Sequence, residues 1–338
     1  MIRSPVCGAV SAAHRRITRP TLVLALLALW LRFPVRALAD GGAEAPPPTD
    51  PVGIALAWRI DIPMLLGLTL LGALYVSASR AVSVGHPASR WPVARTGAFI
   101  GGLVAIGLAL LSPIDTLSDD LLTVHMIQHL LLVSFAAPLF ALSGVGTLAL
   151  RAARPELRNR YLLPLFHSRI VAVLTYPVVG WVAFVGVIWV SHFTTLYNAA
   201  LLDDAIHAME HLLYLAAASL FWWPLLSPDP LRRRLHPLAR FVALLAQVPP
   251  MSFLAITIIG ARAPLYTAYV GRTDAFGIDA LTDQRMAGSL MWAAGDFALA
   301  LPAIVILRAL VRHDEAEARR IDAHLDRQRA RLATMKED

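Results

Sequence analysis

Two pairs of histidines carry the clearest chemical signal in the sequence. His125 and His129 lie in the segment HMIQH, and His207 and His211 lie in the segment HAMEH. Because residues four apart lie on the same face of an α-helix, each pair presents two imidazoles to one side. Neutral imidazole is a good ligand for copper, zinc and iron. The spacing therefore predicts that two helices each offer two ligands to a metal ion.

Further candidate ligands lie close to these pairs in the sequence. A fifth histidine, His192, ends an apolar run. Asp283 opens the last apolar run, where its carboxylate could bind the metal or orient an imidazole that does. Thioethers favour Cu(I), so methionines near the histidines favour copper over zinc and iron. These methionines are Met126, Met209, Met251, Met286 and Met291.

The composition indicates where the elements that carry these residues must lie. The chain is 57% hydrophobic and 16% charged, whereas soluble domains are about one quarter charged. Its net charge of +7 does not come from one basic patch, because the arginines fall in short segments between apolar runs. We therefore exclude nucleic acid as a partner and expect an all-α, polytopic membrane helical bundle in a lipid bilayer. The one cysteine, Cys7, precedes these runs, so a metal site beyond it must use other ligands.

Seven apolar runs have about the 20 residues that a helix needs to cross a bilayer. Basic residues concentrate in the segments after the first, third, fifth and seventh runs, as in Arg232–Arg234. Because cytoplasmic loops carry the excess of Lys and Arg, we predict seven transmembrane helices with the N-terminus outside and the C-terminus inside. The predicted spans are Ile62–Val82, Arg95–Leu111, Leu121–Leu142, Ile170–Val190, Ala205–Leu226, Leu238–Ile259 and Met286–Leu307.

This orientation places five histidines in one layer. The third and fifth spans begin outside, and the fourth ends outside at His192. At the rise of an α-helix, the two pairs then lie about 5–10 Å below the outer surface. Ionisable residues inside a membrane are functional candidates by default. The alternative is that these imidazoles only form hydrogen bonds between helices.

Acidic residues flank this layer on the outer side. Three lie between the second and third spans, and two open the fifth span. They predict a negative field that would attract a cation. These residues are Asp115, Asp119, Asp120, Asp203 and Asp204.

The two termini differ from the apolar centre. Residues 1–39 read as a signal peptide, with a basic start, the apolar stretch Thr21–Leu31 and a small-residue cleavage site at Ala37–Ala39. An uncleaved anchor is the alternative. We expect residues 40–61 to form an extracytoplasmic linker, 62–310 the transmembrane domain and 311–338 a charged cytoplasmic tail. That tail is either a separate amphipathic helix or an extension of the last span.

Several of these motifs occur together, and in this order, in a known family. The segment from His125 to Leu132, followed by Ala137-Pro138-Leu139, resembles the third-span signature of the multi-spanning cytochrome c oxidase assembly factors of the CtaG type. The segments His207–Pro224 and Asp283–Trp292 also resemble this family. The resemblance covers about residues 55–310 and concerns the family associated with the caa-type oxidase, not the single-span copper chaperone of the same name.

The resemblance implies a role in maturing a haem–copper oxidase at the stage of copper insertion. It implies a protein of the bacterial inner membrane whose partners are cytochrome c oxidase subunits. His125, His129, His207 and His211 match the motif positions of the family, and Asp283 also falls in a matching segment.

Four functions fit the histidine layer at this stage. The leading hypothesis is a non-enzymatic assembly factor that receives copper outside and passes it to an oxidase subunit. His207, Glu210 and His211 also match the H-x-x-E-H pattern of zinc hydrolases, in which the glutamate is the general base. Histidines at equal depth on two helices could instead hold the haem of a b-type cytochrome. A copper or cation permease is the fourth, and the sequence leaves open whether the chain forms a homo-oligomer.

Overall fold

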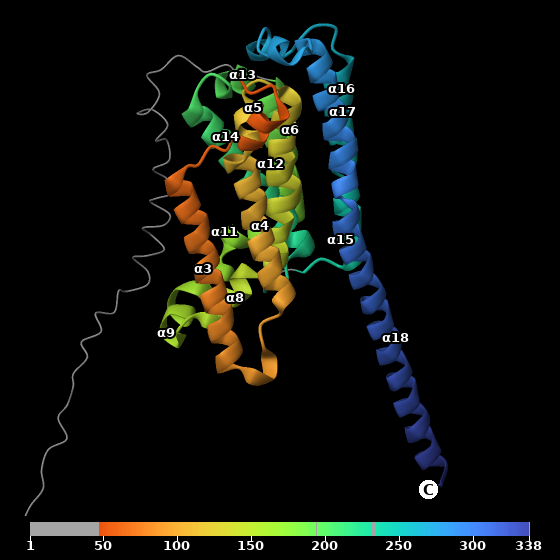
Figure 1. Ribbon diagram of the computed structural model, residues 1–338. Helices are drawn as coiled ribbons and strands as arrows, with labels where there is room; N and C mark the ends of the chain where they lie inside the picture. The colour runs from red at the N-terminus through yellow and green to blue at the C-terminus, as the bar shows by residue number, and fades with distance from the viewer. Residues whose placement is uncertain (1–46, 194, 232–233, 338) are drawn as a thin grey trace, which may run out of the picture. The chain divides into compact units, whose positions relative to one another are not determined.

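The computed structural model describes residues 47–193, 195–231 and 234–337, and side chains as far as residue 329. The expected signal peptide, residues 1–39, lies outside the described residues. All regular elements in the described part of the chain are helices, and each predicted span coincides with helical segments (Figure 1). The α-helices are α2 (Pro51–Leu56), α3 (Ile62–Gly85), α4 (Val93–Leu111), α5 (Pro113–Ser118), α6 (Leu122–Leu130), α7 (Ala137–Ser143), α8 (Val145–Ala152), α9 (Pro155–Leu157), α10 (Leu163–Phe166), α11 (Arg169–Leu174), α12 (Pro177–Phe193), α13 (Thr195–Ala200), α14 (Asp204–Leu226), α15 (Pro237–Leu245), α16 (Val248–Gly260), α17 (Ala280–Ala298) and α18 (Ala300–Glu337).

Five described helical segments are long and apolar enough to cross a membrane. Two further predicted spans are helical but fall outside this set. Helix α12 has 17 residues, and α14 has 23 residues but carries the polar side chains of the second histidine pair. The five segments are Ile62–Gly85, Val93–Leu111, Leu122–Ala152, Pro237–Gly260 and Ala280–Arg329.

The third span changes its helical form just after His129. Helix α6 passes into a π-helical turn, η3 (Leu131–Ala136), before α7 begins. Pro138 lacks an N–H group and so cannot donate a normal helical hydrogen bond, which favours a wider turn before it. The indole of Trp222 on α14 donates to the carbonyl of Val133 at 2.8 Å. This bond fixes the π-helical turn to α14, so the two histidine-bearing helices are tied together.

Three of the predicted spans are interrupted. The fourth is divided between α11 and α12 before Pro177, and the sixth between α15 and α16 at Gln247, two residues before Pro249. The last is divided between α17 and α18 at Leu299, three residues before Pro302. Proline removes a backbone donor and clashes with the preceding turn, so these breaks have a local cause.

A close helix crossing sets the place of α14. Gly180 on α12 lies so near α14 that a Cβ atom at this position would be 2.4 Å from the carbonyl oxygen of Leu220. Helix α14 also packs against α7, and α6 packs against α5 and α17. These contacts hold the N-terminal parts of α6 and α14 at the same end of the bundle.

The segments outside the predicted transmembrane domain are helical in part. The described part of the expected linker contains α2. The predicted charged tail continues the last span as α18, which extends past the other helices in Figure 1. Its side chains are almost all exposed from Val311 to Arg329, so the tail is an extension of the last span rather than a helix packed on its own apolar face.

Candidate metal centre

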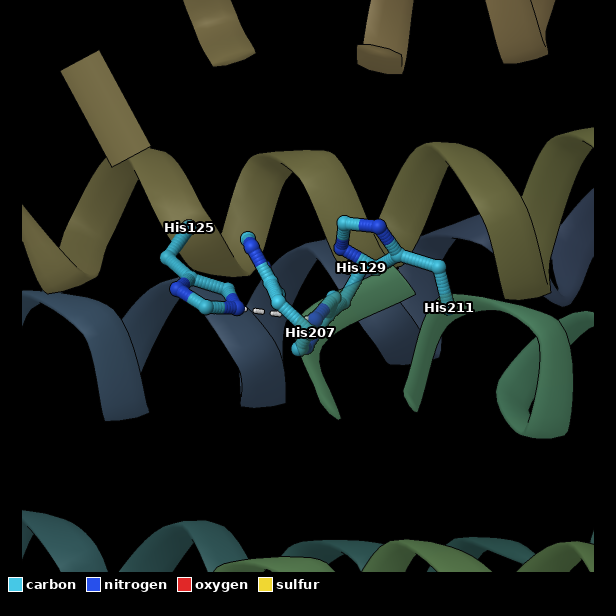
Figure 2. A group of neighbouring side chains, drawn as sticks. All are labelled: His125, His129, His207 and His211. Atoms are coloured by element: carbon cyan, nitrogen blue, oxygen red, sulfur yellow. Dashed lines mark hydrogen bonds between the residues drawn. The ribbon is translucent and has the colours of Figure 1, made fainter. Parts of the chain in front are cut away.

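The four paired histidines converge on one point. His125 and His129 come from α6, and His207 and His211 come from α14; all four side chains are buried. One ligand atom from each lies within 4.8 Å of the ligand atoms of the other three. Figure 2 shows the two pairs facing each other across the space between the helices. Among the residues that the structure describes, this group of four is the candidate metal centre.

The spacing of these nitrogens suits a single metal ion. The Nε2 atoms of His125 and His129 are 2.9 Å apart, and the widest separation in the group is 4.8 Å. A tetrahedral ion with bonds of about 2.0–2.1 Å holds its nitrogen ligands roughly 3.3 Å apart. The observed separations lie on both sides of that value, so small side-chain movements would complete the coordination.

A hydrogen bond from outside the group determines which nitrogen of His125 can bind a metal. The hydroxyl of Tyr269 donates to the carbonyl of Ser118 at 2.8 Å. It must therefore accept from Nδ1 of His125, which lies 2.8 Å away. With the proton on Nδ1, the Nε2 atom directs a lone pair into the group.

Tyr269 is suited to this role because it stays protonated. Burial raises the pKa of its hydroxyl well above the usual value, and the nearby carboxylates of Asp119 and Asp283 act in the same direction. Sequence reasoning missed Tyr269, which lies in the 3₁₀ turn η5 (Thr267–Tyr269) of an outer loop. The sequence carried no signal for it, because only the folded loop brings it to His125.

The structure places the carboxylate of Asp283 at the start of α6. We predicted that it binds the metal or orients an imidazole. Its carboxylate accepts from the backbone N–H groups of Leu122 and Thr123, at 2.6 and 3.2 Å, and from the Thr123 hydroxyl at 2.6 Å. These are the free donors at the start of α6, so Asp283 caps that helix from α17. It therefore positions the first histidine pair through the backbone.

Three of the acidic residues expected at the outer side have partners in the structure. Asp119 pairs with Arg59 at 2.8 Å, and the same guanidinium lies 3.7 Å from Asp115. The buried Asp115 also accepts from Gln128 of α6 at 3.0 Å. Asp203 accepts from two N–H groups in the first turn of α14. These three carboxylates therefore contact α6, the start of α14 or a neighbouring arginine, and the predicted attraction of a cation stays a prediction.

His192 and Met126 lie beside the group of four and not within it. Nδ1 of His192 lies 2.8 Å from the carbonyl of Ile188, and its ring is 6.4 Å from that of Tyr214. Met126 is buried in a cluster that includes Tyr197. Both residues line a neighbouring cavity together with His129, and His192 is not among the four histidines whose ligand atoms converge.

The arrangement is suited to some of the predicted chemistries more than to others. A haem iron needs a porphyrin plane between its two axial nitrogens, but the rings of His207 and His211 are 4.2 Å apart, and those of His125 and His207 are 5.0 Å apart. Neighbouring rings of the four lie 4.2–6.4 Å from one another around one point, so for any axial pair the other two imidazoles occupy the space that a porphyrin would need. Four imidazoles also complete the coordination of zinc, whereas a catalytic zinc keeps one position open for water.

Comparison with known proteins agrees with this organisation. The family described as cytochrome c oxidase caa3 assembly factor (Caa3_CtaG) matches residues 73–313, which include all four histidines. An uncharacterized protein of Mycobacterium leprae is 32% identical over 301 residues, which are 84% of this chain and 44% of that protein. An uncharacterized protein of Mycobacterium tuberculosis is 28% identical over the same shares of both chains.

The chain spans less than half the length of these curated relatives. No solved structure matches it. The family match extends from α3 into α18 and so contains both histidine-bearing helices and the cap on α6. The chain therefore belongs to the cytochrome c oxidase caa3 assembly factor family.

Proposed function

We propose that the four-histidine group binds a copper ion and passes it to a subunit of cytochrome c oxidase during assembly. The observation that carries this proposal is the convergence of four buried ligand atoms within 4.8 Å. Such an all-imidazole set has no thiolate to hold copper too tightly for release. The family to which the chain belongs assembles an oxidase that needs copper, so the cargo and the site agree.

Other metals and functions have less support. Zinc fits the imidazole set equally well by distance, but the methionines around the site favour copper. A zinc hydrolase would need an open coordination position and a general base directed at it. Glu210 instead lies near Tyr214 on its own helix. A b-type cytochrome would need room for a porphyrin among four imidazole rings, of which neighbouring ones lie 4.2–6.4 Å apart.

The proposal includes a topology. The chain would cross the bacterial inner membrane seven times, with α12 and α14 as the two spans in addition to the five long apolar segments. The distribution of basic residues supports an outside N-terminus and an inside C-terminus. The histidine group would then open towards the extracytoplasmic side, where a copper site of the oxidase can be reached. Cysteines introduced in α13 and in α18 should be labelled from opposite sides of the membrane.

Metal analysis of detergent-purified protein tests the binding step. Wild-type protein should hold copper, and the double variant His129→Ala with His211→Ala should hold at least one copper ion fewer per chain. A variant with His86→Ala is a matched control, because this histidine lies in the loop after α3, distant in sequence from both pairs. Equal copper in the wild type and the double variant would end the proposal.

Copper delivery needs a separate measurement. Cells that carry the double variant should make oxidase with less copper than wild-type cells, while membrane levels of the assembly factor stay the same. Normal oxidase copper in those cells would refute delivery but leave metal binding standing.

A further inference from the structure

A small cavity lies next to the four-histidine group and shares one residue with it. Its volume is about 60 Å³, and a single water molecule needs only ~10–15 Å³ on this measure. It therefore has room for one ion or a few waters. His129 belongs both to the four-histidine group and to the wall of the cavity. The other potential ligands in the wall are Met126, Met251, Met291, His192 and Asp296.

The methionines of the chain are distributed unevenly around this cavity. Met126, Met251 and Met291 come from α6, α16 and α17, three helices that the fold brings together here. Met291 packs against two clusters of buried apolar residues. One of them contains Met126, and Met251 packs against the other. Met209 and Met286 lie on the same helices as cavity or centre residues, yet they are 54% and 46% exposed. The cavity thus gathers three of the five thioethers that the sequence places near the histidines.

Two buried imidazole nitrogens lie in the wall without a hydrogen-bond partner among the described residues. Nδ1 of His192 lies 2.8 Å from the carbonyl of Ile188, so this nitrogen carries the proton. Nε2 of His192 is then a bare lone pair, buried and unpartnered in the described part of the chain. Nδ1 of His129 is also buried without a partner there. A buried polar atom left without a partner costs roughly 1–3 kcal/mol.

A metal ion in the cavity would satisfy the lone pair on Nε2 of His192. Thioether sulfur with imidazole nitrogen is a soft donor set that selects Cu(I) among biological metals. Sulfur from two or three methionines with Nε2 of His192 supplies the three or four ligands that such an ion takes. His129 lines this cavity and also belongs to the four-histidine group, where its Nε2 lies 2.9 Å from Nε2 of His125.

We propose that this cavity is a second metal site, specific for Cu(I), that adjoins the four-histidine centre through His129. This inference rests on the proposed function, because the site would give the copper cargo a second position. Apart from His129, the residues of the second site do not belong to the four-histidine centre. Cu(I) bound there requires no electron transfer, so the ion enters and leaves in the same oxidation state.

X-ray absorption on the full-length purified protein tests the site without any substitution in the cavity. Protein loaded with two equivalents of Cu(I) should show sulfur as well as nitrogen around copper. The measurement uses the variant Cys7→Ser, so that every sulfur in the chain is a methionine thioether. Nitrogen alone would overturn the proposal.

Two sets of variants separate this site from the four-histidine centre. The triple variant Met126→Leu, Met251→Leu and Met291→Leu keeps side-chain volume, and such exchanges usually cost less than about 1.5 kcal/mol each. It should bind one fewer Cu(I) ion per chain and lose the sulfur signal. The variant Met209→Leu with Met286→Leu is the matched control and should bind as the wild type does. Unchanged Cu(I) binding by the triple variant would overturn the proposal.

The variant His207→Ala with His211→Ala distinguishes failure of the second-site proposal from failure of the four-histidine centre. It removes two ligands of the four-histidine centre and none from the cavity wall. It should keep one sulfur-bound Cu(I) ion and lose the nitrogen-bound ion. Loss of sulfur-bound copper in this variant would refute a separate second site, whereas retention of all copper would refute only the four-histidine centre.

Discussion

The hydroxyl of Tyr269 should control metal affinity although it touches no metal. Phenylalanine at this position removes the group that accepts from Nδ1 of His125 and donates to the carbonyl of Ser118, both at 2.8 Å. All three partners are buried, so Tyr269→Phe leaves an N–H and a carbonyl without a hydrogen bond. Each such group costs roughly 1–3 kcal/mol.

The effect on metal binding follows from the tautomer. Without Tyr269 nothing keeps the proton on Nδ1 of His125, so Nε2 loses part of its availability as a ligand. Partners that orient a metal-binding imidazole are typically worth about 10–100-fold in affinity. We expect Tyr269→Phe to weaken copper binding by this factor, which equals about 1.4–2.7 kcal/mol.

Competition between the purified protein and a chelator of known affinity measures this factor. Tyr266→Phe is the matched control, because Tyr266 lies in the same outer loop and is equally buried, but its hydroxyl has no hydrogen-bond partner among the described residues. The control should bind copper within about twofold of the wild type. Equal affinities for Tyr269→Phe and the wild type would refute the tautomer argument.

Three further substitutions test other parts of the account. Asp283→Ala removes the cap of α6 and should lower the free energy of unfolding by about 2 kcal/mol in a detergent unfolding titration; an unchanged midpoint would contradict its capping role. Gly180→Ala places a Cβ atom 2.4 Å from a backbone oxygen of α14, so it should lower the unfolding temperature and cost about 1–3 kcal/mol of stability. Gly186→Ala on the same helix is the control. A Cβ atom there has no neighbouring atom within 4 Å, so this variant should not lower stability. Glu210→Gln should retain bound copper, since no imidazole is removed; loss of a hydrolytic activity in this variant would instead support the zinc enzyme.

The sequence predicted the centre well because its signal is local. The four-residue spacing within each pair fixes the face of each helix, and the loop charges predicted that α6 and α14 begin at the same end. Those two facts suffice to bring His125 near His207, whose rings lie 5.0 Å apart. His192 was expected in the same layer, and the structure places it beside the group of four rather than in it.

What the sequence could not predict depends on tertiary contacts. The sequence alone does not determine which groups the carboxylate of Asp283 contacts, because those contacts depend on the packing of α17 against the start of α6. Tyr269 reaches His125 only through the path of an outer loop, which no periodic pattern specifies. The π-helical turn after His129 needs both the missing donor of Pro138 and the indole of Trp222, and the second of these comes from another helix.

The most direct test of the central claim is the electron paramagnetic resonance spectrum of the protein loaded with one Cu(II) ion per chain. Four imidazoles on one ion should give nitrogen hyperfine splitting from four ligands, and the splitting should change when His207 and His211 are replaced by alanine. A spectrum with oxygen ligands only, or one that the double substitution leaves unchanged, would contradict a copper centre formed by these four histidines.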